Sequence, residues 1–516
     1  MGVEERSTPA LTERPAEDRG PRRSSELVDV LDTTAAGGMV IRGSIARTVG
    51  YVAGVGLSVV AASLMVRHLG VVDWGHYVTV MSLITIVAGL SEAGMTTIGV
   101  REYSTRERAE RDTLMRNLLG LRLAVTVLGV ATAVVFAVAA GYEPVLVTGT
   151  AVAGTGAVLT VAQQTYAVPL AAGLRLVWIA LLELARQVGT VVLVIALVLL
   201  DASLLPFLAV SVPVSLLVLG LTFVLVHRAV PLLPAFDRRQ WLHILGLAVV
   251  FSAASAVATL YVSVTVVLTS LVGSSSETGY YGASFRIFIV LTAIPLLLAN
   301  AAFPVVARAA RDDETRLQYS IQRLFDVAVV FGSWLVLATA LGARFAIDVV
   351  AGDKFSPSVT VLEIQAFGLL GTFLSVTWST GLLALHRHRV LLLANLVALA
   401  VAVATTLALV PVLGAKGAAI ATVCGEGALA AIYSVAVATG RRPLRVSLTV
   451  VPRVAVAVVP AAALVFVPHL NRLGLVAAAT VVYFAVVFAV RAMPPELLEA
   501  VVEGRRREHA AESGGG

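Results

Sequence analysis

The sequence contains little charge, few aromatic residues and almost no cysteine. Only 14% of its 516 residues are Asp, Glu, Lys or Arg, and 6% are aromatic, whereas a typical soluble domain carries about 25% charged residues. This shortage excludes a water-soluble globular protein. It also excludes a disordered chain, because disorder requires high charge and few apolar residues. The single cysteine, Cys424, excludes a disulfide-stapled fold.

Apolar residues, in contrast, make up 58% of the chain and occur in long runs. A helix that spans a membrane needs about 20 mostly apolar residues. The sequence therefore predicts an all-α polytopic membrane protein with about 14 transmembrane helices. The predicted spans are residues 44–67, 76–99, 118–140, 145–169, 177–199, 204–227, 243–271, 281–303, 322–342, 357–384, 390–410, 416–438, 447–467 and 472–491.

The basic residues alternate between the loops that join these spans. If the N-terminus is cytoplasmic, the cytoplasmic loops hold 17 arginines and the opposite loops hold four Arg or Lys residues. Cytoplasmic loops retain such positive charge, so we expect a protein of the cytoplasmic membrane with both termini in the cytoplasm. Because the basic residues form no single face, the net charge of +6 does not predict a nucleic-acid partner.

One short pattern recurs at an offset of 204 residues. Asp73-Trp74-Gly75-His76-Tyr77 follows the first span, and Glu277-Thr278-Gly279-Tyr280-Tyr281 follows the seventh, so both read acid-x-Gly-x-Tyr. Six spans separate the copies and give them the same orientation, as in transporters built from parallel repeats. A chance match at three positions is the alternative.

The repeat predicts two pseudo-symmetric six-helix lobes followed by two C-terminal helices. The expected divisions are a disordered cytoplasmic tail at 1–42, an N-terminal lobe at 43–228, a C-terminal lobe at 229–440, spans 13 and 14 within 441–493, and a second cytoplasmic tail at 494–516.

Four segments resemble the polysaccharide-export flippases, and they occur in the order found in that family. Leu69–Tyr77 resembles the family's "LG…yG.Y" turn, and Gly279–Ile287 resembles its "GyYsaa.ki" segment. Gly352–Phe355 resembles a "Gekf" turn, and Leu413–Thr422 resembles "yGa.GAaiAt". The chain is thus similar to oligosaccharide flippases of the multidrug/oligosaccharidyl-lipid/polysaccharide (MOP) exporter superfamily.

This resemblance implies a transporter that moves a polyprenyl-diphosphate-linked oligosaccharide from the inner to the outer leaflet by alternating access. It implies a cavity lined by spans 1, 2, 7 and 8, with the lipid-linked glycan and membrane lipids as partners. A polysaccharide polymerase or glycosyltransferases are further expected partners. Three alternatives stay open: a lipid II flippase, a cation-coupled multidrug exporter, and a membrane glycan polymerase or ligase. No cofactor or metal is expected.

Intramembrane cations are the candidates for binding the cargo, because a charge within a span is costly and a diphosphate is anionic. Arg286 lies about six residues into the eighth predicted span and coincides with the basic position of the resembled motif. Arg47 lies at the cytoplasmic end of the first span and is the supporting candidate. For both, an anchor at the lipid headgroups is the alternative. Arg122, at the start of the third span, is interpreted as such an anchor.

Carboxylates within the spans are the candidates for coupling transport to an ion gradient. Glu92, Glu363 and Glu426 are expected to be unpaired, and Glu92 is preferred because its span is expected to line the cavity. For Glu363 and Glu426, partners in helix packing are an equal alternative. Glu183 and Arg186 are three residues apart on one helix face and are interpreted as a structural pair, with a polar cavity lining as the alternative.

Overall fold

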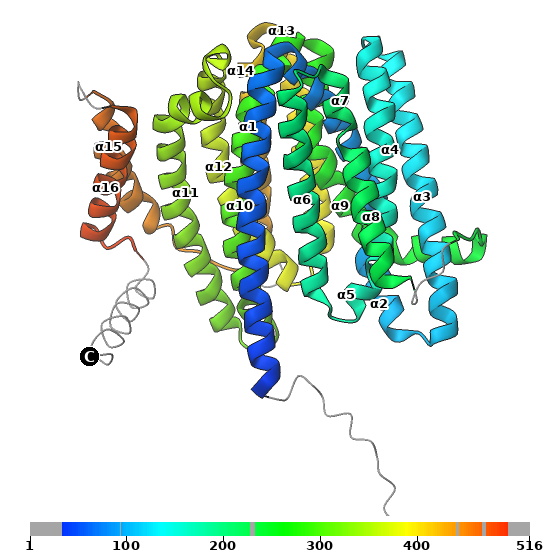
Figure 1. Cartoon of the computed structure of the whole chain (residues 1–516). Coiled ribbons are helices and arrows are strands. Elements are labelled where there is room, and N and C mark those ends of the chain that lie inside the picture. Colours follow the sequence, from blue (N-terminus) through cyan, green and yellow to red (C-terminus); the bar gives the residue numbers. More distant parts are fainter. Residues whose placement is uncertain (1–33, 93, 228–232, 440–442, 467–470, 494–516) are drawn as a thin grey trace, which may run out of the picture. The chain divides into compact units, whose positions relative to one another are not determined.

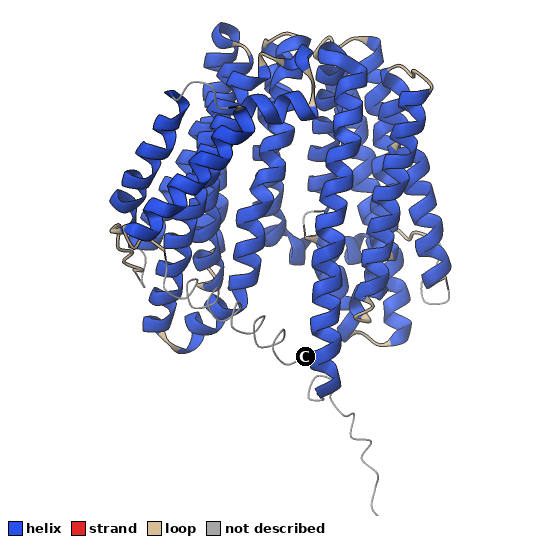
Figure 2. Cartoon of the chain, turned by 60° about the vertical axis from the view of Figure 1, so that its left-hand side comes forward, coloured by secondary structure: helices blue, strands red, loops and turns tan. Residues whose placement is uncertain are grey.

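The computed structural model describes residues 34–92, 94–227, 233–439, 443–466 and 471–493, and every regular element within these ranges is a helix (Figures 1 and 2). The elements are α1 (Thr34–Glu92), α2 (Met95–Thr105), α3 (Arg108–Ala139), α4 (Pro144–Tyr166), α5 (Val168–Ala172), α6 (Leu176–Leu199), α7 (Leu204–Ala209), α8 (Ser211–Val226), α9 (Arg238–Val272), α10 (Ser275–Asp312), α11 (Glu314–Val350), η2 (Asp353–Phe355), α12 (Ser358–Ala384), α13 (His388–Leu413), α14 (Ala415–Thr439), α15 (Val450–Ala463), η3 (Leu464–Phe466) and α16 (Arg472–Ala489).

These helices confirm the predicted fold class. In the described part of the chain, 12 helical segments are long and apolar enough to cross a membrane, and Val450–Phe466 is a shorter apolar helix. One of the 12, Gly56–Thr105, contains two predicted spans. A helix therefore lies at each of the fourteen predicted positions. Helices dominate because lipid offers no hydrogen-bond partner to a backbone that is not paired internally.

The first two predicted spans form one long element that breaks at Gly70. This residue has φ 74° and ψ −174°, so the helical path is interrupted there. A left-handed φ is accessible to glycine because it lacks a Cβ. The helix resumes directly after Gly70, before the approximate start of the second predicted span at residue 76. Gly94, at φ 75°, separates α1 from α2.

Polar side chains cap several helices at the predicted loops. Ser274 accepts a hydrogen bond from the backbone N–H of Glu277 at the start of α10. Asp313 accepts from Thr315 and Arg316 at the start of α11. Such caps satisfy backbone donors that the helix itself leaves unpaired. The hydroxyl and carboxylate residues of the loops thereby define where these two helices begin.

By its internal contacts the chain separates into Met1–Val49 and Gly50–Gly516. Of the first segment, the structure describes residues 34–49 as the beginning of α1. This helix begins within the segment 1–42 that the composition predicts to be a disordered tail. Residues 1–33 and the predicted tail at 494–516 lie outside the described residues, and the predicted domain limits stay predictions.

Within Gly50–Gly516, the helices pack mainly with neighbours in the sequence. Helices α2 to α8 contact one another, with α4 against α3, α7 and α8. Helices α9 to α14 form a second set of contacts, with α14 against α12 and α13. The C-terminal helices α15 and α16 pack on each other and on α11. Helix α9 also contacts α2 and α3 of the first set, and the division into two lobes stays a prediction.

Two glycines allow α1 and α10 to cross in direct backbone contact. A Cβ on Gly75 would overlap the carbonyl oxygen of Ser275, and a Cβ on Gly279 would overlap the carbonyl oxygen of Val71. Val71 and Ser275 each precede their own glycine by four residues. The two halves of the contact are therefore equivalent under the 204-residue offset, as in a self-complementary interface. The repeated acid-x-Gly-x-Tyr pattern marks this crossing.

We expect Gly279→Ala to destabilise the protein, because the added methyl group would displace the Val71 carbonyl. Overpacking of this kind costs about 1–3 kcal/mol, so the purified protein should show a lower melting temperature in detergent. Gly220→Ala is the matched control, because a Cβ at Gly220 on α8 meets no atom within 4 Å. An unchanged melting temperature for Gly279→Ala would show that the crossing is not tightly packed.

Candidate functional site

Arg286 extends from α10 toward α1. It lies eleven residues after Ser275, the first residue of α10, and thus roughly 16 Å along the helix. Its Nη2 donates hydrogen bonds to the hydroxyl and to the carbonyl oxygen of Ser58. Its Nε is buried without a hydrogen-bond partner among the described residues. The cation is therefore deeper in its helix than the six residues predicted, and it faces α1.

Helices α1, α10 and α11 contact one another near the break at Gly70, at the end of the helices that we call the Gly70 end. Here the Arg67 guanidinium donates to the backbone oxygens of Asp348 and Val349 at 2.7 and 2.6 Å. The His76 ring and the Ser275 hydroxyl are 3.0 Å apart. A buried apolar cluster contributed by α1, α6, α7, α10, α11 and α12 fills the surroundings. The structure is therefore closed at this end.

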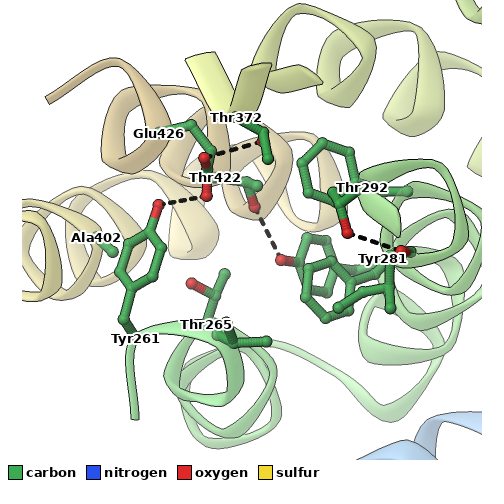
Figure 3. Close-up of a pocket in the computed structure, with 12 residues that line it drawn as sticks. Tyr261, Thr265, Tyr281, Thr292, Thr372, Ala402, Thr422 and Glu426 are labelled. Atoms are coloured by element: carbon green, nitrogen blue, oxygen red, sulfur yellow. Dashed lines mark hydrogen bonds between the residues drawn. The ribbon is translucent and has the colours of Figure 1, made fainter. Parts of the chain in front are cut away.

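Glu426 faces a cavity of about 140 Å³ among α9, α10, α12, α13 and α14 (Figure 3). The hydroxyls of Tyr261 and Thr372 donate to its carboxylate at 2.8 and 2.9 Å. The hydroxyls of Tyr281 and Thr422 pair at 2.9 Å on another side of the cavity. Among the residues that line it, none is Lys, Arg or His. Among the described residues, only neutral donors therefore hold this carboxylate.

A second cavity, of about 410 Å³, lies among the helices that precede α7; we call it the Glu92 cavity. Its lining consists of Glu92, Thr96, Gln163, Gln164, Ala167, Val168, Ala171, Ile179, Leu182, Glu183 and Arg186.

Arg122 is completely buried beside this cavity and forms an ion pair with Glu92. Its Nη1 donates to Thr96 Oγ1 at 2.9 Å, and its Nη2 donates to Gln164 Oε1 at 3.2 Å. A buried guanidinium is tolerated when carboxylates and amides satisfy it. Arg122 therefore holds Glu92 and Gln164 in place at the cavity wall.

On α6, the Nε of Arg186 lies 3.5 Å from Oε2 of Glu183. Both side chains line the Glu92 cavity. The Nη2 of Arg186 also donates to Gln163 Oε1 at 2.7 Å. The side chain of Gln187 donates to Glu183 Oε1 at 3.1 Å. The geometry accommodates a structural pair and a polar lining at once, so both interpretations of these residues stay predictions.

Two interpretations from the sequence are wrong. Glu92 was expected to be unpaired, but it is neutralised by Arg122. Arg122 was expected to be an anchor at the headgroups, but none of its side chain is exposed. Both errors have one cause: residues 30 positions apart in the chain come together only when α1 packs against α3.

The other candidates are dispersed through the structure. Glu363 is half-buried on α12, and the described residues offer it no hydrogen bond or ion pair. Glu426 has the neutral partners described above. Arg47 lies within α1, but its side chain is outside the described residues. The structure brings only Glu92, Glu183 and Arg186 together around one cavity.

Several residues at these cavities were missed or given no role from the sequence. Tyr261 and Thr372 contact Glu426 from helices that the sequence cannot place together. Gln163 and Gln164 on α4 line the Glu92 cavity, which hydropathy does not reveal. A usable signal was present at Arg122, whose neighbours from Leu118 to Thr126 are mostly apolar. A headgroup anchor should have more polar flanks.

Comparison with protein families identifies the chain. The model of a family described as "Polysaccharide biosynthesis protein" matches residues 64–360, more than half of the sequence. The chain belongs to the polysaccharide biosynthesis protein family. The match includes both copies of the acid-x-Gly-x-Tyr pattern and Arg286. Membership in this family confirms the resemblance found in the sequence motifs. No curated protein is significantly similar to the sequence.

This member of the polysaccharide biosynthesis protein family has the fold of MOP superfamily transporters. It is similar to the lipid II flippase MurJ in an inward closed conformation, with a TM-score of 0.74, 12% identity, and coverage of 87% of this chain and 99% of that one. An inward-facing multidrug resistance MATE family transporter gives a TM-score of 0.57, 15% identity, and coverage of 72% and 92%. A MOP superfamily transporter from Pyrococcus furiosus gives a TM-score of 0.53 and 17% identity, with coverage of 76% of this chain and 93% of that one. These similarities show a multi-pass membrane transporter fold.

We expect Glu92→Gln to destabilise this family member, because Arg122 would remain buried without a countercharge. Breaking a fully buried pair costs about 3–5 kcal/mol, and the cost here should be smaller since the Glu92 side chain is 39% exposed. Thermal unfolding in detergent measures the effect. The double variant Glu92→Gln/Arg122→Gln should recover part of the loss.

Glu102→Gln is the matched control, because it breaks an i,i+4 pair with Arg106, whose side chain is 18% exposed, whereas Arg122 is completely buried. It should cost no more than about 1 kcal/mol. Equal melting temperatures for Glu92→Gln and Glu102→Gln would contradict a structural role for the buried pair.

Proposed function

We propose that the protein moves a polyprenyl-diphosphate-linked oligosaccharide from the inner to the outer leaflet of the cytoplasmic membrane, for the biosynthesis of cell-surface polysaccharide. The observation that carries this proposal is Arg286, a cation within α10 that faces α1 and keeps a buried N–H without a partner. The planar fork of a guanidinium binds two phosphate oxygens at once. Membership in the polysaccharide biosynthesis protein family supports a glycan as the cargo.

The contact with Ser58 suggests how Arg286 releases and takes up its cargo. In the described structure, Nη2 donates to the Ser58 hydroxyl and carbonyl oxygen. Phosphate oxygens carry more negative charge than these neutral acceptors, so a diphosphate would replace them with charge-assisted hydrogen bonds. When the cargo leaves, Ser58 satisfies the guanidinium again. The cation therefore need not remain unpaired in the membrane between transport cycles.

Transport requires that the Gly70 end open and close. The distribution of arginines predicts that this end faces outward and that both termini are cytoplasmic, so the described arrangement is the one closed to the outside. Opening would separate Gly75 from Ser275 and Arg67 from the carbonyls at Asp348 and Val349. A rocking motion of the two predicted lobes would break these contacts together, which gives alternating access rather than a continuous pore.

Coupling to an ion gradient is assigned to Glu426 among the three carboxylates predicted from the sequence. Arg122 already neutralises Glu92, and Glu363 lines neither of the two cavities described above. Glu426 is buried, faces a cavity and is held only by neutral hydroxyls. A buried carboxylate without a cation is stabilised when it binds a proton or a metal cation, so ion binding and release at Glu426 would change the charge of the C-terminal lobe.

A lipid II flippase is the second candidate, favoured by the fold match that covers 99% of the MurJ chain. A multidrug exporter for cations is disfavoured, because Arg286 would repel such cargo. A glycan polymerase or ligase would require bond-making residues and is disfavoured by the transporter fold. Polysaccharide polymerases and glycosyltransferases then act as partners that supply or consume the lipid-linked glycan.

Depletion of the protein from the cells that produce it should cause a polyprenyl-diphosphate oligosaccharide to accumulate in the inner leaflet. Complementation with Arg286→Gln should leave this accumulation in place, because losing a charge-assisted contact of about 1.5–3 kcal/mol weakens binding about tenfold or more. Arg286→Lys should restore transport partly, since it keeps the charge but not the fork. The measurement is lipid extraction, with the lipid-linked oligosaccharide assigned to the inner or outer leaflet. It is made on the depleted strain and on the two strains complemented with Arg286→Gln and Arg286→Lys.

Arg389→Gln is the control, because Arg389 is an exposed cation at the start of α13. It should complement fully. Accumulation of lipid II instead would establish the second candidate, and turnover of the lipid-linked glycan by the detergent-purified protein would indicate an enzyme. Full complementation by Arg286→Gln would remove Arg286 from the mechanism.

Glu426→Gln should abolish the stimulation of transport by an imposed proton or sodium gradient in proteoliposomes. The reason is that the amide keeps the shape of the carboxylate but does not exchange an ion. Glu363→Gln, at the half-buried carboxylate of α12, should retain the stimulation. The measurement is the rate of leaflet exchange of a labelled polyprenyl-diphosphate glycan with and without each gradient. Retained stimulation in Glu426→Gln would move coupling to another residue.

A further inference from the structure

The Glu92 cavity is lined by charged and polar groups, and Arg286 is not among them. Two carboxylates, Glu92 and Glu183, face it together with the Arg186 guanidinium, and Arg122 lies buried behind Glu92. The two formal negative charges and two formal positive charges cancel. A phosphate would be repelled by the carboxylates and a cation by the guanidiniums, so the cavity favours an uncharged ligand.

The lining of the cavity combines hydrogen-bond donors and acceptors with apolar side chains. The carboxylate and amide oxygens accept, and the guanidinium and amide nitrogens donate. Ala167, Ala171 and Leu182 are among the apolar lining residues. The hydroxyls of a sugar both donate and accept, while its ring carbons present C–H groups. A volume of about 410 Å³ lies within the range of small-molecule sites.

Arg122 fixes the positions of three polar side chains that line the Glu92 cavity. Its side chain is completely buried, and it binds Glu92, Thr96 and Gln164 simultaneously. Its Nε is buried without a partner among the described residues. Polar groups held this way present fixed partners to a ligand, which lowers the entropic cost of binding.

The Glu92 cavity also lies near Arg286 along connected helices. Arg286 contacts Ser58, and Gly54 lies one helical turn away on α1, or about 6 Å. A Cβ at Gly54 would be 3.7 Å from the Gln187 side chain, and Gln187 binds Glu183 in the cavity wall. One turn of α1, the contact of Gly54 with Gln187, and one turn of α6 thus connect the cation to the cavity wall.

We propose that the Glu92 cavity binds the sugar residues that follow the diphosphate of the cargo, while Arg286 binds the diphosphate itself. This inference rests on the proposed function, since it assigns a second subsite to the same ligand. The charge balance of the cavity further assigns it to uncharged sugars rather than to acidic ones, because a uronic acid would face Glu92 and Glu183.

The experiment compares two probes with the purified full chain in lipid nanodiscs: a polyprenyl diphosphate, and the same lipid carrying an uncharged disaccharide. The wild-type protein should bind the glycosylated probe about tenfold more tightly, as expected from two or three net hydrogen bonds. Ala171→Phe, which fills the cavity, and Glu183→Ala should both abolish this difference. Neither should change the affinity for polyprenyl diphosphate.

Two matched controls should keep the tenfold difference: Ala131→Phe on the exposed face of α3, and Glu102→Ala at the Arg106 pair. If the two cavity variants also keep it, the sugar subsite is overturned while the proposed function stands. If the wild-type protein binds neither probe, the proposed function fails and the subsite fails with it. Melting temperatures identify any variant that does not fold; for such a variant, the other cavity variant decides.

Discussion

The backbone contact between α1 and α10 is the constraint on which the arrangement of the other functional elements depends. Helices approach this closely only where no Cβ intervenes, and Gly75 and Gly279 provide that gap from both sides. The contact brings the Arg67 side chain to the end of α11 and seats Arg286 against Ser58 on α1. A single pair of glycines thereby sets the distance between the two helix groups at the Gly70 end.

The intramembrane charges follow a simple division. Arg122 and Glu92 neutralise each other within one helix group, and Glu183 and Arg186 do the same on a neighbouring helix. Arg286 and Glu426, in contrast, have only neutral hydrogen-bond partners among the described residues. The low dielectric of the surroundings makes this difference large. The paired charges hold helices together, whereas the proposed function assigns Arg286 to the cargo and Glu426 to an ion.

The positions of the helices, although not each boundary, were accessible from the sequence because they depend on nearby residues. Long apolar runs predicted all fourteen helix positions, and Gly70 and Gly94 lie where the backbone changes direction. The acid-x-Gly-x-Tyr pattern predicted an internal repeat, and its glycines meet at the crossing. The motifs also predicted the family. In contrast, Arg122 was misinterpreted, because the position of an arginine near the start of a span does not reveal which carboxylate packs against it.

The sequence by itself determined the helical membrane fold, the order of the spans and Arg286 as the candidate for the diphosphate. These properties are local: they follow from the length of apolar runs, the conformational freedom of glycine and the cost of a charge in lipid. Only the tertiary structure decided that Glu92 is paired, that Glu426 has neutral partners, and that Gln163, Gln164 and Glu183 share a cavity. Such pairings join residues from different helices, and hydropathy is the same whichever helices are neighbours.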